Sequence, residues 1–194
     1  DFAVRPNCAR APEAIGACDL VLIGLKTTAN DQLPNLLPPL VGPDTLVLTL
    51  QNGLGNEAQL ARLFPVPQIM GGLCFVCLNR VEPGLIRHLD HGRIVIGEHL
   101  GPPGPRTHEL ARNFQGTGVP CTVAENLEHA HWEKLTWNIP FNGLGVSGVA
   151  GYDAVRRGHL SAETPLGVCL TTRALLADSR WEAMLRALMH EVIQ

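Results

Sequence analysis

The fold is decided by one apolar stretch near the start of the chain, Asp19-Leu20-Val21-Leu22-Ile23-Gly24-Leu25-Lys26. A continuous apolar run that ends in a cation is typical of a parallel β-strand buried on both faces. The carboxyl ends of such strands border the ligand crevice of open α/β sheets. We therefore predict a strand here and place Lys26 at a ligand site. The alternative is a lysine that is merely solvated at a strand end.

A second apolar strand is predicted over Thr45–Leu50, which consists of β-branched residues and leucine. It leads into the glycine-rich turn 51–55 and then into Asn56, the expected N-cap of a helix. Glycine allows the backbone to approach a ligand closely, and the Asn52 side chain offers both a donor and an acceptor. A plain Asn-Gly turn is the alternative, but the strand end at Lys26 favours a site.

A third polar cluster lies on a helix predicted downstream, within His131–Asn142. Lys134, Asn138 and Asn142 follow one another at intervals of four residues, so they drift by only about 40° per step and share one helix face. Most of the other residues there are apolar, so this polar face needs a partner, which is either protein or substrate. Among fifteen lysines and arginines only Lys26 and Lys134 are lysines, and lysine can give up its proton where arginine cannot.

The remaining pattern predicts an α/β fold followed by helices. After residue 26 we expect a helix from the Thr28–Asp31 cap to Leu40, a turn at 42–44, a strand at 68–78, a hairpin of 84–89 and 93–97 around 90–92, a helix at 107–115, a strand at 119–124, and further helices at 125–142, 164–177 and 179–193. Strands that alternate with helices and then form a hairpin indicate a mixed sheet. Residues 1–124 are therefore predicted to form one domain, and residues 125–194 a second, helical domain.

Composition excludes several classes of partner. The net charge is −3 and no basic run is present, so nucleic acid is not expected. No apolar stretch approaches the length of a membrane span, so we expect neither membrane insertion nor a membrane partner. Six scattered cysteines without a secretory signal indicate reduced thiols in a cytoplasmic protein. No histidine or cysteine spacing predicts a metal site; Cys74 and Cys77, three apart in a strand, point to opposite faces.

The ordered set of Lys26, the turn containing Asn52, and the Trp132–Leu135 segment with Asn138 and Asn142 resembles the ketopantoate reductase (2-dehydropantoate 2-reductase) family. Supporting residues are Gly72 in the third strand and Glu82-Pro83-Gly84 before a strand that contains Arg87-His88. The resemblance implies a Rossmann-type domain followed by an all-helical C-terminal domain. It also implies NADPH-dependent reduction of a 2-oxo acid, ketopantoate, to pantoate for pantothenate biosynthesis.

The resemblance also implies a role for each matching residue. Lys134 matches the family's catalytic lysine, and Asn138 and Asn142 match its substrate-contacting asparagines. Asn52 matches the asparagine at the nicotinamide and substrate end, and Lys26 the lysine that lines the cofactor cleft. The sequence does not determine the oligomeric state: the last helices can pack on further helices of the chain or on another subunit, and a homodimer is one of the assemblies left open.

Two departures keep other functions open. The family's glycine-rich dinucleotide motif would lie before residue 1 and its last helices after residue 194, so the Rossmann-type domain is partial and we expect a fragment of a longer protein. A non-catalytic reductase-like fragment or interaction domain is therefore one alternative. A related hydroxyacid dehydrogenase with a lysine-and-asparagine helix is another, although the turn at residues 51–55 argues against it.

Overall fold

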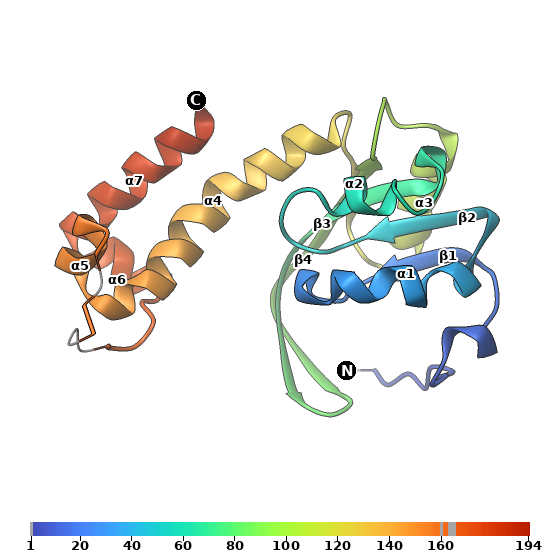
Figure 1. The fold of residues 1–194 in the computed structure, drawn as a ribbon, viewed down its shortest axis with the longest axis horizontal. Helices are drawn as coiled ribbons and strands as arrows, with labels where there is room; N and C mark the ends of the chain where they lie inside the picture. The colour runs from blue at the N-terminus through green and yellow to red at the C-terminus, as the bar shows by residue number, and fades with distance from the viewer. Residues whose placement is uncertain (1, 160, 163–165) are drawn as a thin grey trace. The chain divides into compact units, whose positions relative to one another are not determined.

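The computed structural model describes residues 2–159, 161–162 and 166–194 and contains a mixed five-stranded sheet followed by helices (Figure 1). The strands stand in the order β1-β2-β3-β4-β5. They are β1 Cys18–Ile23, β2 Val41–Thr49, β3 Ile69–Glu82, β4 Leu85–Glu98 and β5 Cys121–Val123. β1, β2 and β3 pair in parallel, β4 is antiparallel to β3, and β5 is parallel to β4. The predicted α/β class is confirmed.

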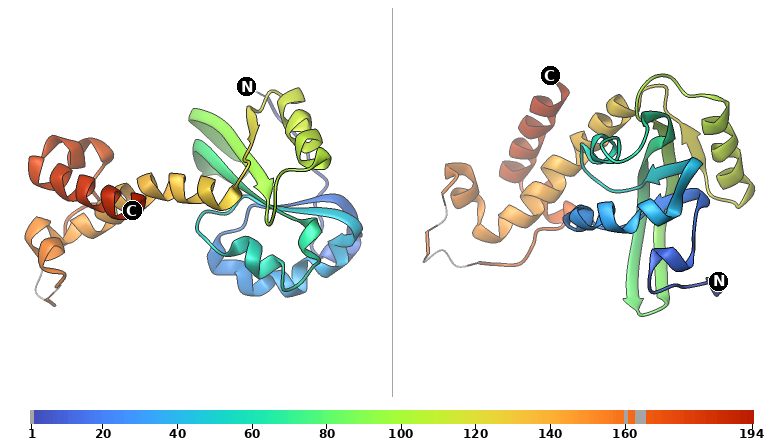
Figure 2. Two further views of the ribbon diagram at one scale, coloured as in Figure 1. Left: turned by 90° about the horizontal axis from the view of Figure 1, so that it is seen from above. Right: turned by 45° about the vertical axis from the view of Figure 1, so that its right-hand side comes forward.

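Helices cover both faces of this sheet (Figure 2). On one face, α1 (Leu33–Leu36) and α2 (Asn56–Leu60) pack against β1, β2 and β3 through a core of Val21, Ile23, Leu33, Leu37, Val47, Leu60 and Ile69. On the other face, α3 (Pro105–Gly116) packs against β4 and β5 through Leu48, Met70, Ile94, Ile96, Leu110, Ala111 and Cys121. The inner strand β2 therefore contributes alternate residues to two cores, as period-two alternation requires.

β1 differs from its prediction because it is an edge strand of the described sheet. Val21 and Ile23 are buried, but Leu22, which points to the other face, is 49% exposed. The expected burial on both faces is therefore wrong, since α3 covers the β4–β5 end of that face. The strand also stops at Ile23 rather than at Lys26.

The turn predicted at Gly42–Asp44 is likewise wrong, because these residues lie within β2. They form an irregular step in the β1–β2 pairing, in which Cys18 faces Val41 but Leu20 faces Leu46. Thr45 bridges the two strands at this irregularity. Its hydroxyl donates to the carbonyl of Cys18 at 2.5 Å and accepts from the N–H of Gly42 at 2.8 Å. A local turn signal was overridden by strand pairing.

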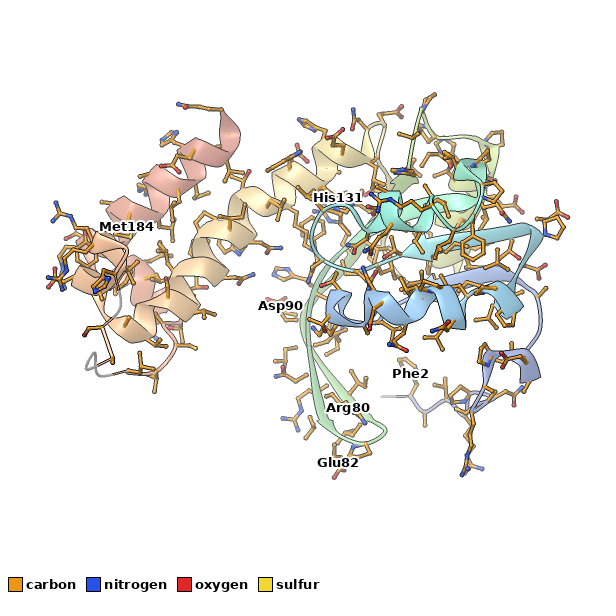
Figure 3. All side chains as sticks on the ribbon, in the orientation of Figure 1. Phe2, Arg80, Glu82, Asp90, His131 and Met184 are labelled. Carbon is orange, nitrogen blue, oxygen red and sulfur yellow. The ribbon has the colours of Figure 1, made fainter. Side chains whose placement is uncertain are left out.

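β3 and β4 form a long hairpin whose turn lies at Pro83–Gly84, near Arg80 and Glu82 (Figure 3). The predicted turn at Asp90–Gly92 is wrong. His91, with φ 63°, and Gly92, with φ 125°, instead form a bulge in β4, where Val76 faces His91 and Phe75 faces Arg93. Residues that adopt the left-handed backbone conformation are common in turns, but here they form a β-bulge.

The helix predicted from Thr28 to Leu40 is replaced by three short pieces. A 3-10 helix over Thr27–Gln32 precedes α1, and a second covers Pro38–Leu40. Prolines at 34, 38 and 39 lack the N–H that a longer α-helix would need, so the segment breaks into single turns.

The contacts divide the chain into two compact units, one that ends at Ala130 and a helical one over His131–Gln194. The predicted domain boundary after residue 124 stays a prediction. The Asn126 side chain accepts from the N–H of His129 at 2.9 Å and caps the start of α4 (Leu127–Ser147). α4 continues past Gly143, where a break was expected, and is followed by a 3-10 turn over Gly148–Ala150.

The helical unit contains α5 (Tyr152–Arg157), α6 (Thr172–Ala177) and α7 (Ser179–Ile193). Its core consists of Phe141, Leu144, Leu175, Trp181 and Leu185. The predicted α7 is confirmed, but the helix expected from Thr164 begins only at Thr172. Thr164 itself lies outside the described residues.

No helix among the described residues is both long enough and apolar enough to cross a lipid bilayer.

Candidate functional site

One group of predicted site residues lies in the segments that follow β1 and β2. These strands end side by side, since Ile23 pairs with Thr49 and the N–H of Leu50 donates to the carbonyl of Ile23 at 3.0 Å. Lys26 and Asn52 therefore lie on neighbouring connections at one end of the sheet, as the sequence predicts. The Lys26 side chain is exposed, and its backbone carbonyl accepts from the N–H of Ala29 at 2.8 Å.

A network of side-chain amides joins these two connections. The buried Gln51 donates from Nε2 to the carbonyl of Leu25 and to Oδ1 of Asn30, both at 2.8 Å. Asn30 in turn donates from Nδ2 to Oδ1 of Asn56 at 3.1 Å and to Oε1 of Gln59 at 2.7 Å. Asn56 then donates to the backbone carbonyl of Asn52 at 3.3 Å. The network runs from the peptide before Lys26 to Asn52 and contains no charged side chain.

The turn after β2 borders a polar depression of about 430 Å³. Its lining residues are Thr27, Asn30, Asn52, Gly53, Leu54, Gly55, Asn56, Ala58, Gln59 and Arg62. Gly53 and Gly55 have φ values of 99° and 84°, which side-chain-bearing residues rarely adopt, so the turn depends on glycine. Gly55 is the N-cap of α2, and the predicted cap, Asn56, is the first helical residue instead.

α2 is held close to the sheet by a glycine in β3. A Cβ on Gly71 would overlap Oε1 of the buried Glu57 and come within 2.6 Å of Cδ2 of Leu127. Only glycine leaves room for a carboxylate at this point on the strand. The close approach fixes the helix that supplies Asn56 and Gln59 to the amide network.

A second group of predicted site residues lies on α4, within the helical unit. Lys134 and Asn138 are half-buried and Asn142 is exposed, and all three lie on the same helix, as predicted. Within the described part of the helical unit, neither the Asn138 amide nor the Asn142 amide has a hydrogen-bond partner. On another side of α4, Trp137 stacks on Phe141 with ring centroids 3.9 Å apart. Lys26 with Asn52, and Lys134 with the two asparagines, thus form two groups, each within its own unit.

Metal and disulfide chemistry find no support in the part of the chain that the structure describes. No group of three or more His, Cys, Asp or Glu side chains there could hold a metal ion. Cys74 is half-buried and Cys77 is exposed, and neither forms a disulfide.

The sequence matches the family described as ketopantoate reductase PanE/ApbA over residues 1–101. The chain belongs to the ketopantoate reductase family. It is 40% identical over 180 residues to a 2-dehydropantoate 2-reductase of Nostoc sp., covering 90% of this chain and 50% of that protein. A 2-dehydropantoate 2-reductase of Halobacterium salinarum is 32% identical over 176 residues, which is 91% of this chain and 56% of that protein.

A solved structure agrees with this assignment. The crystal structure of 2-dehydropantoate 2-reductase from Geobacter metallireducens has a TM-score of 0.69 and 42% identity and covers 94% of this chain and 64% of that one. The chain spans about half the length of the curated ketopantoate reductase relatives it matches.

Gln51 and Asn30 are the site residues whose role the sequence did not indicate. The sequence pattern indicates only a turn at Gln51 and only a helix cap at Asn30. The available signal was weak: a glutamine directly after an apolar strand enters a buried environment, where its amide needs partners. Those partners come from residues 21 and 26 positions away, which no local pattern reveals.

Proposed function

We propose that the protein, as part of its full-length chain, reduces a 2-oxo acid with NADPH, and that this acid is ketopantoate. Membership of the ketopantoate reductase family is the observation that carries the proposal. Two features of the structure support it: polar residues gathered at the carboxyl ends of β1 and β2, and the lysine and two asparagines on one helix of the second unit.

The residues after β1 and β2 suit a dinucleotide. Carboxyl ends of parallel strands are where open α/β sheets bind such ligands, and the turn with Gly53 and Gly55 presents backbone without side chains. Lys26 is an exposed cation that suits an anionic group, and Asn52 supplies an amide. These residues would hold the cofactor, which supplies the hydride.

Lys134 is proposed as the general acid. Reduction of a ketone builds negative charge on its oxygen, and an ammonium group directed at that oxygen stabilises the charge and donates a proton. Arginine in this place would keep the charge but would be a very poor acid. Lys134 is half-buried, so its charge is less screened than that of a fully exposed lysine.

Asn138 and Asn142 are proposed to bind the 2-oxo acid. Their amides donate to a carboxylate or hydroxyl group without adding charge beside Lys134. Since both lie on the helix that carries Lys134, they place the substrate relative to the acid through one rigid element.

Steady-state oxidation of NADPH by the full-length protein tests this function. Ketopantoate is compared with a panel of 2-oxo acids that differ beyond the keto group, and NADH is compared with NADPH. We expect ketopantoate and NADPH to give the highest kcat/KM. Turnover with another 2-oxo acid alone would keep the reaction class and reject the substrate, and absence of turnover with every acid would reject the function. The mass of the same protein in solution tests whether it forms a homodimer.

A further inference from the structure

Gln51 lies directly before Asn52, and the role inferred for it rests on the proposed function. Gln51 is only 6% exposed, and its amide nitrogen and oxygen are both hydrogen-bonded within the protein. Besides the two bonds from Nε2, its Oε1 accepts from the hydroxyl of Thr49 at 3.0 Å, and Thr49 is fully buried. Both N–H groups of this amide and its oxygen are bonded within the protein and the residue is buried, so the amide serves the protein's own backbone rather than a ligand.

Gln51 holds the backbone at Lys26 and at Asn52, the two residues proposed to bind the cofactor. Leu25, whose carbonyl accepts from Gln51, precedes Lys26, so this bond fixes the peptide plane that leads into the lysine. Through Asn30 and Asn56 the same amide is connected to the carbonyl of Asn52. One buried side chain therefore sets the spacing between two connections that the strands alone leave free beyond Ile23 and Thr49.

A second buried glutamine provides an internal comparison. Gln68 is 8% exposed and donates from Nε2 to the carbonyls of Gly42, Pro43 and Thr45 at 2.7, 3.1 and 3.0 Å. It ties the first half of β2, at the opposite end of the strand from Gln51. The two glutamines match in residue type, burial and the use of Nε2 as a donor, but only Gln51 borders the proposed cofactor residues.

We propose that Gln51 is a positioning residue for cofactor binding: with Asn30 it holds the Lys26 and Asn52 backbones in their working arrangement. The network is built from amides because each amide both donates and accepts, so it links two chain segments without a charge. A neutral support adds no charge of its own beside Lys26 and the Arg62 that lines the depression.

The test compares Gln51→Met with Gln68→Met in the full-length protein. Methionine has a similar length and removes every hydrogen bond of the amide, so both variants should lower the thermal midpoint. Only Gln51→Met should weaken NADPH binding, by about tenfold in the dissociation constant measured by fluorescence, because small displacements of binding groups are costly. Hydrogen exchange of the cofactor-free protein should accelerate at residues 26–30 and 52–56 in Gln51→Met, and at residues 42–45 in Gln68→Met.

Asn30→Ala is the second variant, in case Gln51→Met does not fold. It keeps the bond from Gln51 to Leu25 and breaks the connection to Asn56, so we expect a smaller loss of NADPH affinity, of about threefold. Equal NADPH affinity in the Gln51, Asn30 and Gln68 variants would overturn the positioning role while leaving the proposed function intact. A wild-type protein that neither binds NADPH nor reduces any 2-oxo acid would overturn both.

Discussion

The segments after β1 and β2 and the polar face of α4 both carry side-chain amides, but they use these amides in opposite ways. After β1 and β2, the amides of Gln51, Asn30 and Asn56 bind one another and nearby carbonyls. On α4, the amides of Asn138 and Asn142 have no hydrogen-bond partner within the described helical unit. Since a buried amide must be satisfied but an accessible one need not be, the first set supports backbone and the second set is available to a ligand.

This difference separates stability from binding. Removing an amide from the strand-end network leaves buried polar groups unpaired, which costs about 1–3 kcal/mol for each group. Removing an amide from α4 leaves no protein group unpaired, so the fold should be unaffected. The following changes test that separation, beginning with the largest expected effect.

Lys134→Ala in the full-length protein should reduce kcat by about 10²- to 10⁴-fold, the range typical of general acid catalysis. The thermal midpoint should stay close to that of the wild type, because Lys134 is half-buried rather than enclosed. Steady-state kinetics with NADPH and ketopantoate measure the first quantity, and a thermal melt measures the second. Lys134→Arg is the matched control: it retains the charge and should remain strongly impaired. Unchanged turnover in Lys134→Ala would contradict the proposed role.

Asn138→Ala and Asn142→Ala should each raise the KM for the 2-oxo acid by about tenfold, since hydrogen bonds to a charged group contribute about 1.5–3 kcal/mol. The thermal midpoint should be unaffected, in contrast to Gln51→Met. Initial rates at varied substrate concentration, combined with melts of all three variants, check both statements. A stability loss in the asparagine variants equal to that in Gln51→Met would remove the distinction between the two regions.

The smallest effect is expected at the start of α7, where a carboxylate caps a helix. Asp178 accepts from the N–H of Arg180 at 2.9 Å and forms an ion pair with its guanidinium at 2.8 Å. These hydrogen bonds from Arg180 lower the pKa of Asp178 from 3.8 to about 2. Because the folded pKa is the lower one, this stabilisation is complete above pH 4 and is lost as the pH falls towards 2.

Asp178→Asn should therefore flatten the fall of the thermal midpoint between pH 4 and pH 2 while changing it little at pH 7. Asparagine still caps the helix, so the variant isolates the charge. The group is exposed, which keeps the effect small. Glu182→Gln, whose carboxylate pairs with Arg186 four residues later at 2.7 Å, serves as a control in the same helix. An unaltered acid dependence in Asp178→Asn would contradict the assignment.

Sequence patterns predicted the elements whose signals are local. The apolar runs located β1 and β2, the spacing at Ser179–Ile193 located α7, and intervals of four placed Lys134, Asn138 and Asn142 on one helix. Sequence patterns gave the wrong local structure where pairing between strands decides it. Residues 42–44 and 90–92 were predicted as turns, but the first lie within β2 and the second form a bulge in β4. Turn-forming residues are compatible with both structures, and only the neighbouring strand selects one.

The sequence by itself determined the fold class, the family and the residue types that the proposed chemistry requires, because apolar periodicity and ordered motifs are properties of the chain alone. The tertiary structure decided how those residues are supported. Gln51 meets the Leu25 carbonyl and Asn30 only after β1 and β2 pair, across 26 and 21 positions of sequence. A hydrogen bond acts over about 3 Å, so contacts between distant segments are defined only when the backbone has brought them together.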